Sequence, residues 1–302
     1  MRRYSPRRLL AVCAAVGMAG SVAGCAVAGT PAVSAPGKPS ATERPAPSWH
    51  TTAAIHRQAS SPASAPASPA RRDRRLLSGK VIGIDAGHNG LNHTDPAYLN
   101  HLIWNGRERE ACDTSGTQTA SGYTEALFNF NVAVDLRAYL RRDGSKVVMT
   151  RQNNHGLGPC VNKRSQIINA AHADVAIDIH ADGGPSWGRG FTVLEPVADG
   201  PNDGVVAPSL RLGRYVHRAF LSRTPMRTSD YYGHNGYMLR DDLAGLNLTT
   251  VPKVLIECGN MTNAADAALL TSPAVQHRIA RALEAAIIRY LTGTWPARGA
   301  RR

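Results

Sequence analysis

The stretch KVIGIDAGHNG, residues 80–90, contains a short apolar run that ends at a histidine. Residues 81–84 are rich in valine and isoleucine, which predicts a buried strand. Residues 85–87, with their aspartate and glycine, predict a tight turn that presents His88 directly after the strand. A histidine in a turn need not have a function. Whether His88 belongs to a functional site depends on which residues occupy the ends of the other strands.

From Lys80 onward, apolar segments alternate with amphipathic ones. Five segments predict strands because valine and isoleucine are frequent in them, and they cover residues 81–85, 146–150, 175–180, 190–194 and 253–258. Four segments carry apolar residues at helical spacing, and they cover residues 123–142, 161–172, 208–222 and 273–291. Strands without polar alternation are usually buried on both faces. We therefore predict an α/β fold: a single domain with a mostly parallel or mixed central sheet of about five to six strands, flanked by helices on both faces.

The first part of the chain has the composition of an exported protein. Residues 1–24 combine four arginines with an apolar run and small residues, the order found in a signal peptide. The residues before Cys25 resemble a bacterial lipobox, which predicts a lipidated cysteine as membrane anchor; the alternative is cleavage nearby, with Cys25 removed. Residues 25–79, rich in Ala, Pro and Ser, predict a disordered tether, and residues 294–302 predict a basic disordered tail. We expect a protein at the outer face of the cytoplasmic membrane or in the cell wall or periplasmic space.

The net charge of +13 does not indicate a nucleic-acid-binding domain, because most of it lies outside the globular part. Residues 1–79 contain 11 Lys and Arg against 2 Asp and Glu, whereas the remaining residues contain 24 against 20. A domain so close to neutral lacks the basic face that binds phosphates, so no nucleic-acid partner is expected. The sequence shows no coiled-coil or apolar surface pattern, which predicts a monomer.

Cysteine usage agrees with export. Cys112 and Cys160 both lie in polar, glycine-rich segments, and we predict that they form a disulfide, although two free cysteines would also fit the sequence. Cys258 lies in an apolar strand and is predicted to be a buried thiol. The disulfide would fasten the long segment 89–121, which lacks regular patterning and exceeds the usual length of a connection, to the loop before helix 161–172.

Four side chains are candidates for one site. His88 follows one predicted strand, His180 ends a second and Glu257 lies near the end of a third. The carboxyl ends of strands are where α/β sheets bind ligands. Glu125 lies in the first turn of a helix, where an acid could serve only to stabilise the helix dipole. Two histidines and one acid match the ligand set of a catalytic zinc site, and a second acid could exchange protons with zinc-bound water. The residues alone leave open which glutamate is the ligand and which is the base.

Four separated motifs give the chain a resemblance to a known family. They read IDAGHNG, SGYTEALFNFNVAVDLRAYL, RSQIINAAHADVAIDIHADGG and VLIECGNMTNAAD. In this order and spacing they resemble the zinc-dependent N-acetylmuramoyl-L-alanine amidases of bacterial cell walls, and GLGPC, HADGGP and DLAGLN resemble the mycobacterial type. The resemblance extends over residues 80–293, which we take as the catalytic domain.

The resemblance implies an enzyme and assigns its residues. It implies one Zn²⁺ per chain bound by His88, Glu125 and His180, with Glu257 as the catalytic base. It also implies hydrolysis of the amide bond between N-acetylmuramic acid and L-alanine, in peptidoglycan or in a soluble muropeptide. Two other interpretations stay open: a zinc carboxypeptidase or endopeptidase that cuts within the stem peptide, and a catalytically inactive cell-wall-binding lipoprotein.

Other polar residues near the motifs have weaker assignments. Asp85 and Asp178 could orient the zinc ligands, but a place at a strand end is an equally ordinary reason for an acid. Asn260 and Arg240 are candidates for substrate contact. In family members that carry it, an extra helix covers the zinc glutamate; this sequence shows no such long insertion. An active form is therefore expected, with segment 89–121 as a further candidate for covering the site.

Overall fold

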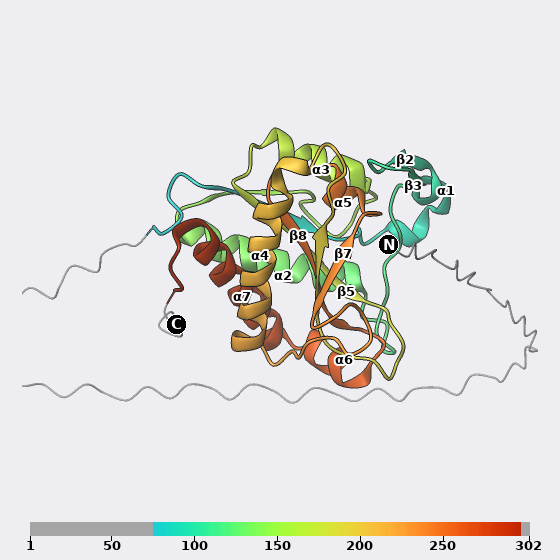
Figure 1. The fold of residues 1–302 in the computed structure, drawn as a ribbon. Helices are drawn as coiled ribbons and strands as arrows, with labels where there is room; N and C mark the ends of the chain where they lie inside the picture. Colours follow the sequence, from blue (N-terminus) through green and yellow to red (C-terminus); the bar gives the residue numbers. More distant parts are fainter. Residues whose placement is uncertain (1–74, 297–302) are drawn as a thin grey trace, which may run out of the picture. The chain divides into compact units, whose positions relative to one another are not determined.

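A six-stranded mixed sheet forms the centre of the domain in the computed structural model, which describes residues 75–296 (Figure 1). The strands are β1 (Val81–Ala86), β4 (Lys146–Met149), β5 (Val175–Asp182), β6 (Thr192–Pro196), β7 (Tyr237–Arg240) and β8 (Lys253–Asn260). Their order across the sheet is β4-β1-β5-β8-β6-β7. Strands β4, β1, β5 and β8 are parallel to one another, whereas β6 is antiparallel to β8 and β7 is parallel to β6. The predicted α/β fold is confirmed.

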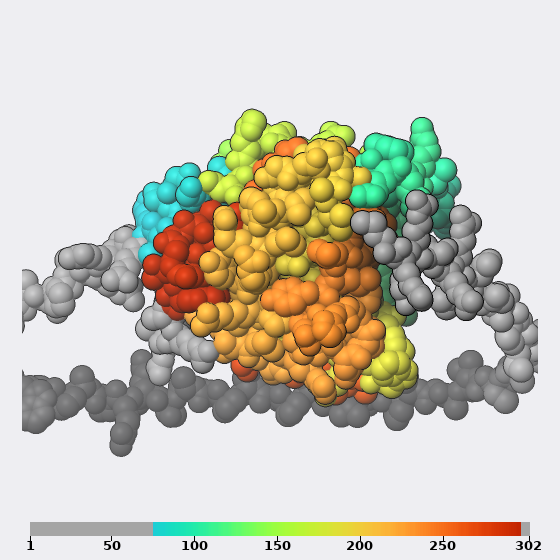
Figure 2. Space-filling view, in the orientation of Figure 1, coloured from blue at the N-terminus to red at the C-terminus, as the bar shows by residue number. Residues whose placement is uncertain are grey.

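Helices cover both faces of this sheet. The first face packs against α2 (Glu125–Arg142), α4 (Asp203–Arg223) and α7 (Pro273–Thr292), which are neighbours in Figure 1. The second face is covered by α3 (Val161–Ala170) and the short helix α5 (Ala244–Asn247), while α6 (Ala264–Leu270) follows β8. Figure 2 shows α4 on the surface of the domain, beside the segment that leads to β7.

The strands divide their side chains between the two faces. In β1, and in β8 as far as Cys258, the even-numbered residues belong to the large apolar core formed with α2, α4 and α7, and in β5 the odd-numbered residues do. The alternate residues point to the face of α3 and α5, because successive side chains of a strand point to opposite faces. Asp85 is in register with Asp178, and His180 with Glu257. These polar residues therefore share the second face of the sheet.

Segment 89–121 has more regular structure than the sequence predicted. It contains a 3-10 turn at Asn92–Thr94, the helix α1 (Pro96–Asn100) and a hairpin of β2 (Leu102–Trp104) and β3 (Arg109–Ala111). Each element is only three to five residues long, too short to leave a clear hydrophobic period in the sequence. The predicted disulfide Cys112–Cys160 is confirmed and fastens the end of the hairpin to the start of α3, and Cys258 is a buried free thiol as predicted.

The domain extends beyond both boundaries that the sequence predicted. Leu77, assigned above to the tether, is buried in the core, and its N–H donates a hydrogen bond to the carbonyl of Asp143. Trp295, assigned above to the tail, packs edge-on against Tyr215. The helix expected from residue 208 begins earlier, at Asp203, and the sequence did not predict the short edge strand β7.

Within residues 75–296 no helix has the length and apolar character needed to cross a membrane. The predicted signal peptide, the lipidation at Cys25 and most of the predicted tether and tail lie outside the described residues.

Removal of the disulfide is expected to destabilise the domain. The bond joins cysteines separated by 48 residues, and closing a loop of this size contributes about 3–4 kcal/mol in the chain-entropy model. The double variant Cys112→Ala/Cys160→Ala should therefore have a melting temperature roughly 5–15 °C below that of the native chain. Thermal unfolding followed by circular dichroism measures the difference, with the native chain in reductant as the control that should match the variant. Equal melting temperatures for variant and native chain would contradict a stabilising role.

Candidate active site

His88, Glu125 and His180 meet at the carboxyl edge of the sheet, although they come from three separate elements. Glu125 lies between the two histidines: its Oε2 is 3.2 Å from Nε2 of His88, and its Oε1 is 2.8 Å from Nδ1 of His180. One nitrogen or oxygen from each of the three side chains lies within 4.8 Å of the others. The structure thus brings together the three residues that the sequence proposed as metal ligands.

A local constraint after β1 allows the two imidazoles to approach each other. His88 adopts a left-handed backbone conformation with a φ of 54°, which is uncommon for a residue other than glycine and is often found at functional sites. Its neighbour Gly87 cannot carry a side chain without rearrangement, because a Cβ there would lie 2.3 Å from Cε1 and Nε2 of His180. The two rings therefore meet edge to face, with centroids 4.8 Å apart. Gly87 belongs to the site, whereas the sequence predicted only a turn at this residue.

Glu125 begins α2, but helix stabilisation does not account for its surroundings. Its buried carboxylate accepts hydrogen bonds from the backbone N–H groups of Thr117 and Ala181 and from the side chain of Asn129. Burial raises the pKa of this carboxyl group, but the charge of His88 and the hydrogen bond from His180 hold it well below its usual range. Glu125 is therefore an ionised carboxylate fixed between two imidazoles.

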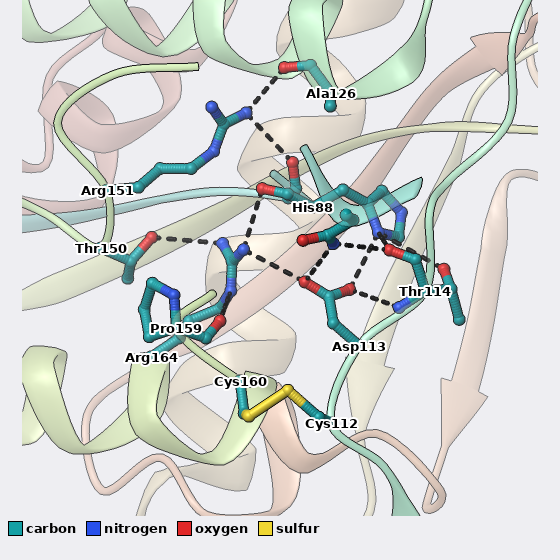
Figure 3. A network of polar contacts seen from close by, with 12 residues as sticks. His88, Cys112, Asp113, Thr114, Ala126, Thr150, Arg151, Pro159, Cys160 and Arg164 are labelled. Carbon is teal, nitrogen blue, oxygen red and sulfur yellow. Dashed lines mark hydrogen bonds and ion pairs between the residues drawn. A yellow bond between two sulfur atoms is a disulfide. The ribbon is translucent and has the colours of Figure 1, made fainter. Parts of the chain in front are cut away.

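Each imidazole has an aspartate on its other side. Nδ1 of His88 lies 3.0 Å from Oδ1 of Asp113, as Figure 3 shows, and Nε2 of His180 lies 3.3 Å from Oδ1 of Asp178. Burial lowers the pKa of both histidines, but the neighbouring carboxylates outweigh it, raising the pKa of His88 to about 9 and that of His180 well above its usual value. Asp113 was not predicted from the sequence, although its position next to Cys112 was a signal.

Glu257 lines the same cavity as the two histidines. Its Oε2 atom is buried and has no hydrogen-bond partner among residues 75–296. Burial raises the pKa of this carboxyl group to about 8, with the charge of His180 opposing the shift and that of Glu125 reinforcing it. Buried polar atoms without a partner are rare in folded proteins, so this carboxyl group is suited to meet a ligand.

A cavity of about 420 Å³ lies beside the donor cluster of His88, Glu125 and His180, and its lining includes the two histidines. Its polar wall includes His88, His180 and Glu257. Its apolar wall is formed by leucines from β6, from β8 and from the region of α5, namely Leu194, Leu255, Leu243 and Leu246. Arg240 at the end of β7 also lines the cavity, held by an ion pair with Asp242 and a hydrogen bond to the hydroxyl of Tyr232. The volume lies in the range of small-molecule sites.

Asp85 forms its ion pairs with two buried cations rather than with either histidine. Its oxygens lie 2.9 Å from Nη1 of Arg164 and 2.7 Å from Nζ of Lys253, and Thr150 donates a further hydrogen bond. Burial raises the pKa of Asp85, but the charges of Lys253 and Arg164 hold it well below its usual range. Neither cation was predicted from the sequence; Arg164 lies in α3 and Lys253 at the start of β8.

Asn260 supports a loop instead of the cavity. Its amide group donates hydrogen bonds of 2.8 Å to the carbonyls of Pro185 and Gly188. The side chain is fully buried and does not belong to the cavity wall. In this structure Asn260 fixes the loop that follows β5, and the predicted contact with substrate stays a prediction.

The donor cluster fits a metal ion. Two imidazoles and one carboxylate are the protein ligands of several catalytic zinc sites. Each imidazole directs one nitrogen toward Glu125 and the other toward an aspartate, the arrangement by which carboxylates orient metal-binding histidines. The fold and this site define a class: single-domain α/β proteins with a candidate metal centre at the carboxyl edge of the sheet.

The chain belongs to the N-acetylmuramoyl-L-alanine amidase family, whose model matches residues 82–289. An N-acetylmuramoyl-L-alanine amidase of Mycobacterium tuberculosis is 38% identical over 237 residues, which cover 78% of this chain and 94% of the relative. The crystal structure of the apo form of an N-acetylmuramyl-L-alanine amidase from Mycobacterium abscessus is similar, with a TM-score of 0.67 and 38% identity over 72% of this chain and 100% of that chain. An amidase structure from Mycobacterium smegmatis gives a TM-score of 0.68 and 34% identity over 72% and 99%. The resemblance seen in the sequence is confirmed.

Gly87→Ala is expected to displace the ring of His180 and to weaken metal binding. The added Cβ would lie 2.3 Å from two ring atoms, so the imidazole must leave its place beside Glu125. We expect a loss of zinc affinity of at least about 10-fold, measured by competition with a chromogenic chelator. Gly204→Ala in α4, where a Cβ meets nothing within 4 Å, is the matched control and should bind zinc as the native chain does. Native affinity in Gly87→Ala would contradict the close approach of the two rings.

The metal-free protein is expected to lose stability as the pH rises from about 6.5 to about 9. The pKa of His88 is about 9 in the folded protein against an ordinary 6.5, so its stabilisation is complete below pH 6.5 and is lost as the pH passes 9. The carboxyl group of Glu257 also lowers the stability as the pH rises from 4.5 to about 8. In this range the carboxyl group is ionised in the unfolded chain but keeps its proton in the folded protein.

Urea unfolding of chelator-treated protein at the two ends of this range measures the change in the free energy of unfolding. Glu125→Gln removes the carboxylate between the two histidines and should reduce the pH dependence. A free energy of unfolding that is equal at pH 6.5 and pH 9 would refute this electrostatic description of the cluster.

Proposed function

We propose that this protein is a zinc-dependent N-acetylmuramoyl-L-alanine amidase, which hydrolyses the amide bond between N-acetylmuramic acid and the L-alanine of the peptidoglycan stem peptide. One observation carries the proposal. Glu257, with a buried oxygen that has no partner within the described residues, lines the same cavity as both histidines of the donor cluster. A protein that only stored a metal ion would need the cluster but would have no use for this fourth group.

Zinc would be held by His88, Glu125 and His180, one ion per chain, with a coordination position left for water or substrate. When bound, the ion lowers the pKa of a coordinated water and polarises the scissile carbonyl group. The chain itself contributes a fixed set of donors. Asp113 and Asp178 lie against the far side of the imidazoles, and backbone N–H groups hold the carboxylate of Glu125.

Glu257 would move the proton during the reaction. It accepts a proton from the attacking water as the oxygen of that water bonds to the carbonyl carbon of the lactyl group. The carboxyl group accepts the proton in its ionised form, and a pKa that burial raises to about 8 then lets it hold the proton until transfer. The proton then passes to the nitrogen of L-alanine as the C–N bond breaks. The products are a free carboxyl group on the muramic acid and a free amino group on the peptide.

The cavity offers the surfaces that a muramoyl peptide needs. Its polar wall presents His88, His180 and Glu257, and its leucines provide an apolar wall. Arg240 supplies a cation fixed by Asp242 and Tyr232, and we propose that it faces a carboxylate of the stem peptide. Residues of segment 89–121 also line the cavity, so this segment helps to enclose the substrate.

We also propose that the protein acts outside the cytoplasm, on peptidoglycan or on soluble fragments of it. The support is the first part of the sequence, with its arginines, its apolar run and the lipobox-like residues before Cys25. A lipid on Cys25 would anchor the domain to the outer face of the membrane. We expect the anchored protein to act as a monomer.

Glu257→Gln is expected to abolish hydrolysis while leaving zinc binding intact. The amide cannot accept the proton of the attacking water, so turnover of a defined muramoyl peptide should fall by about 10²–10⁴-fold. Mass spectrometry identifies the products formed by the mature chain, and zinc content is measured on the same samples. The matched control is Glu195→Gln, which removes another buried strand carboxylate outside the cavity wall and should retain native turnover.

Free L-alanyl peptide and intact muramic acid from the native chain support the proposal. Cleavage between amino acids of the stem peptide would keep the metal site but replace the amidase with a peptidase. No cleavage by zinc-loaded native protein would contradict the proposed activity and favour an inactive wall-binding lipoprotein.

A further inference from the structure

A chain of buried ion pairs joins the two aspartates that lie against the histidines. Oδ2 of Asp113 lies 3.3 Å from Nη2 of Arg164, whose Nη1 lies 2.9 Å from Oδ1 of Asp85. Oδ2 of Asp85 lies 2.7 Å from Nζ of Lys253, which lies 3.0 Å from Oδ2 of Asp178. An aspartate in a loop and an aspartate in β5 are thus connected through two cations.

With the histidines and the glutamate of the donor cluster, these residues close a ring. Its members in order are His88, Asp113, Arg164, Asp85, Lys253, Asp178, His180 and Glu125. Acidic and basic groups alternate around the ring, and each carboxylate and imidazole uses a different atom for each of its two neighbours. Displacement of one member therefore displaces the group beside it.

The two cations of the ring are almost inaccessible to solvent. Arg164 is 2% exposed and Lys253 is 1% exposed. Such residues are almost never fully buried unless they are paired, because removal of a charge from water is costly. Replacement of a buried ion pair by apolar residues is often neutral or stabilising. A fold that needed stability alone could therefore replace each cation together with its carboxylates, whereas the connection of both cations to the histidines gives a functional reason to keep them.

Arg164 also holds the backbone around His88, as Figure 3 shows. Its Nη1 donates a hydrogen bond of 2.8 Å to the carbonyl of Ala86, and its Nη2 donates one of 2.9 Å to the carbonyl of His88. Its Nε donates to the carbonyl of Pro159, next to the disulfide-bonded Cys160. One guanidinium group thus fixes both the aspartate beside His88 and the left-handed turn that carries the imidazole.

We propose that Arg164 and Lys253 are positioning residues of the metal site. They hold Asp113 and Asp178 in place, so that Nε2 of one histidine and Nδ1 of the other stay directed toward the ion. Neither cation supplies a donor atom to the metal. The proposal rests on the proposed zinc function and assigns both residues to the affinity for zinc.

If Arg164 and Lys253 acted only through their positive charge, they would weaken the binding of zinc instead of strengthening it. The ring contains four carboxylates and two cations, which leaves two negative charges when the imidazoles are neutral, and one Zn²⁺ balances them. Loss of Lys253 would add a third negative charge near the ion, and Coulomb attraction alone would then tighten zinc binding. Loss of a positioning contact weakens zinc binding instead. The two roles therefore predict opposite changes in one dissociation constant.

Arg164→Lys is the sharpest test, because it keeps the positive charge but replaces the planar guanidinium group and its several N–H donors with one ammonium group. A single ammonium group cannot bridge Asp85, Asp113 and the two carbonyls beside them. We expect the dissociation constant for zinc to rise about 10- to 100-fold. We also expect the visible absorption spectrum of the Co²⁺-substituted protein to change, because the donor geometry changes. Lys253→Met removes the second cation and should weaken zinc binding to a similar extent.

Lys80→Met is the matched control. Lys80 also pairs with an aspartate, Asp174, at 2.8 Å, but at the surface and at the amino end of β1. Its removal should leave the zinc affinity at the native value. Thermal unfolding of the mature chains checks that each variant is folded before zinc is titrated, and the two ring variants provide independent measurements if one of them does not fold.

Weaker zinc binding by a folded ring variant, with native affinity in Lys80→Met, supports the positioning role. Native affinity in both Arg164→Lys and Lys253→Met, or tighter binding by Lys253→Met, would overturn the positioning role and leave the proposed amidase intact. A native chain that binds no zinc would overturn both proposals.

Discussion

Four carboxylates lie buried at one edge of the sheet, and the ion pairs that compensate their charges constrain the architecture around them. An unpaired carboxylate in such a place would cost several kcal/mol, roughly enough to consume much of the stability of a domain. Arg164 therefore has to reach the interior from α3, and Lys253 from the start of β8. The packing of α3 on the sheet is thus determined by charge as well as by its apolar contacts, which centre on Ile168 and Ala176.

Strand geometry explains why these charges and the donor cluster share one face. Asp178 and His180 are two residues apart in β5, and Lys253 and Glu257 are four apart in β8, so each pair points the same way. The other face of the same strands, from Val175 to Ala181 in β5 and from Val254 to Cys258 in β8, belongs to the large apolar core with α2, α4 and α7. One face of the sheet therefore packs against the apolar core, and the other carries the residues of the candidate active site. Glu125 completes the cluster because α2 begins where the strands end.

The sequence predicted the central strands and the main helices because long apolar runs carry a clear period. Elements of three to five residues in segment 89–121 carry no such period and could not be found. The histidines and Glu257 could be predicted because they lie at or near the ends of predicted strands, and the family resemblance separated the roles of the two glutamates. Asp113, Arg164 and Lys253 were missed for a physical reason: they meet only through tertiary contacts, from a loop, a helix and a strand start. The loop support by Asn260 was not predicted, because an amide at a strand end serves loop support as readily as substrate binding.

The most direct test of the central claim is the position of the metal itself. A crystal of the zinc-loaded protein, measured on both sides of the zinc absorption edge, gives an anomalous difference map that locates the ion. We predict a single peak about 2.0–2.2 Å from one donor atom each of His88, Glu125 and His180, with Glu257 beyond bonding distance. A peak bonded to Glu257 in place of Glu125, or one beside His101 and the disulfide, would contradict the proposed site.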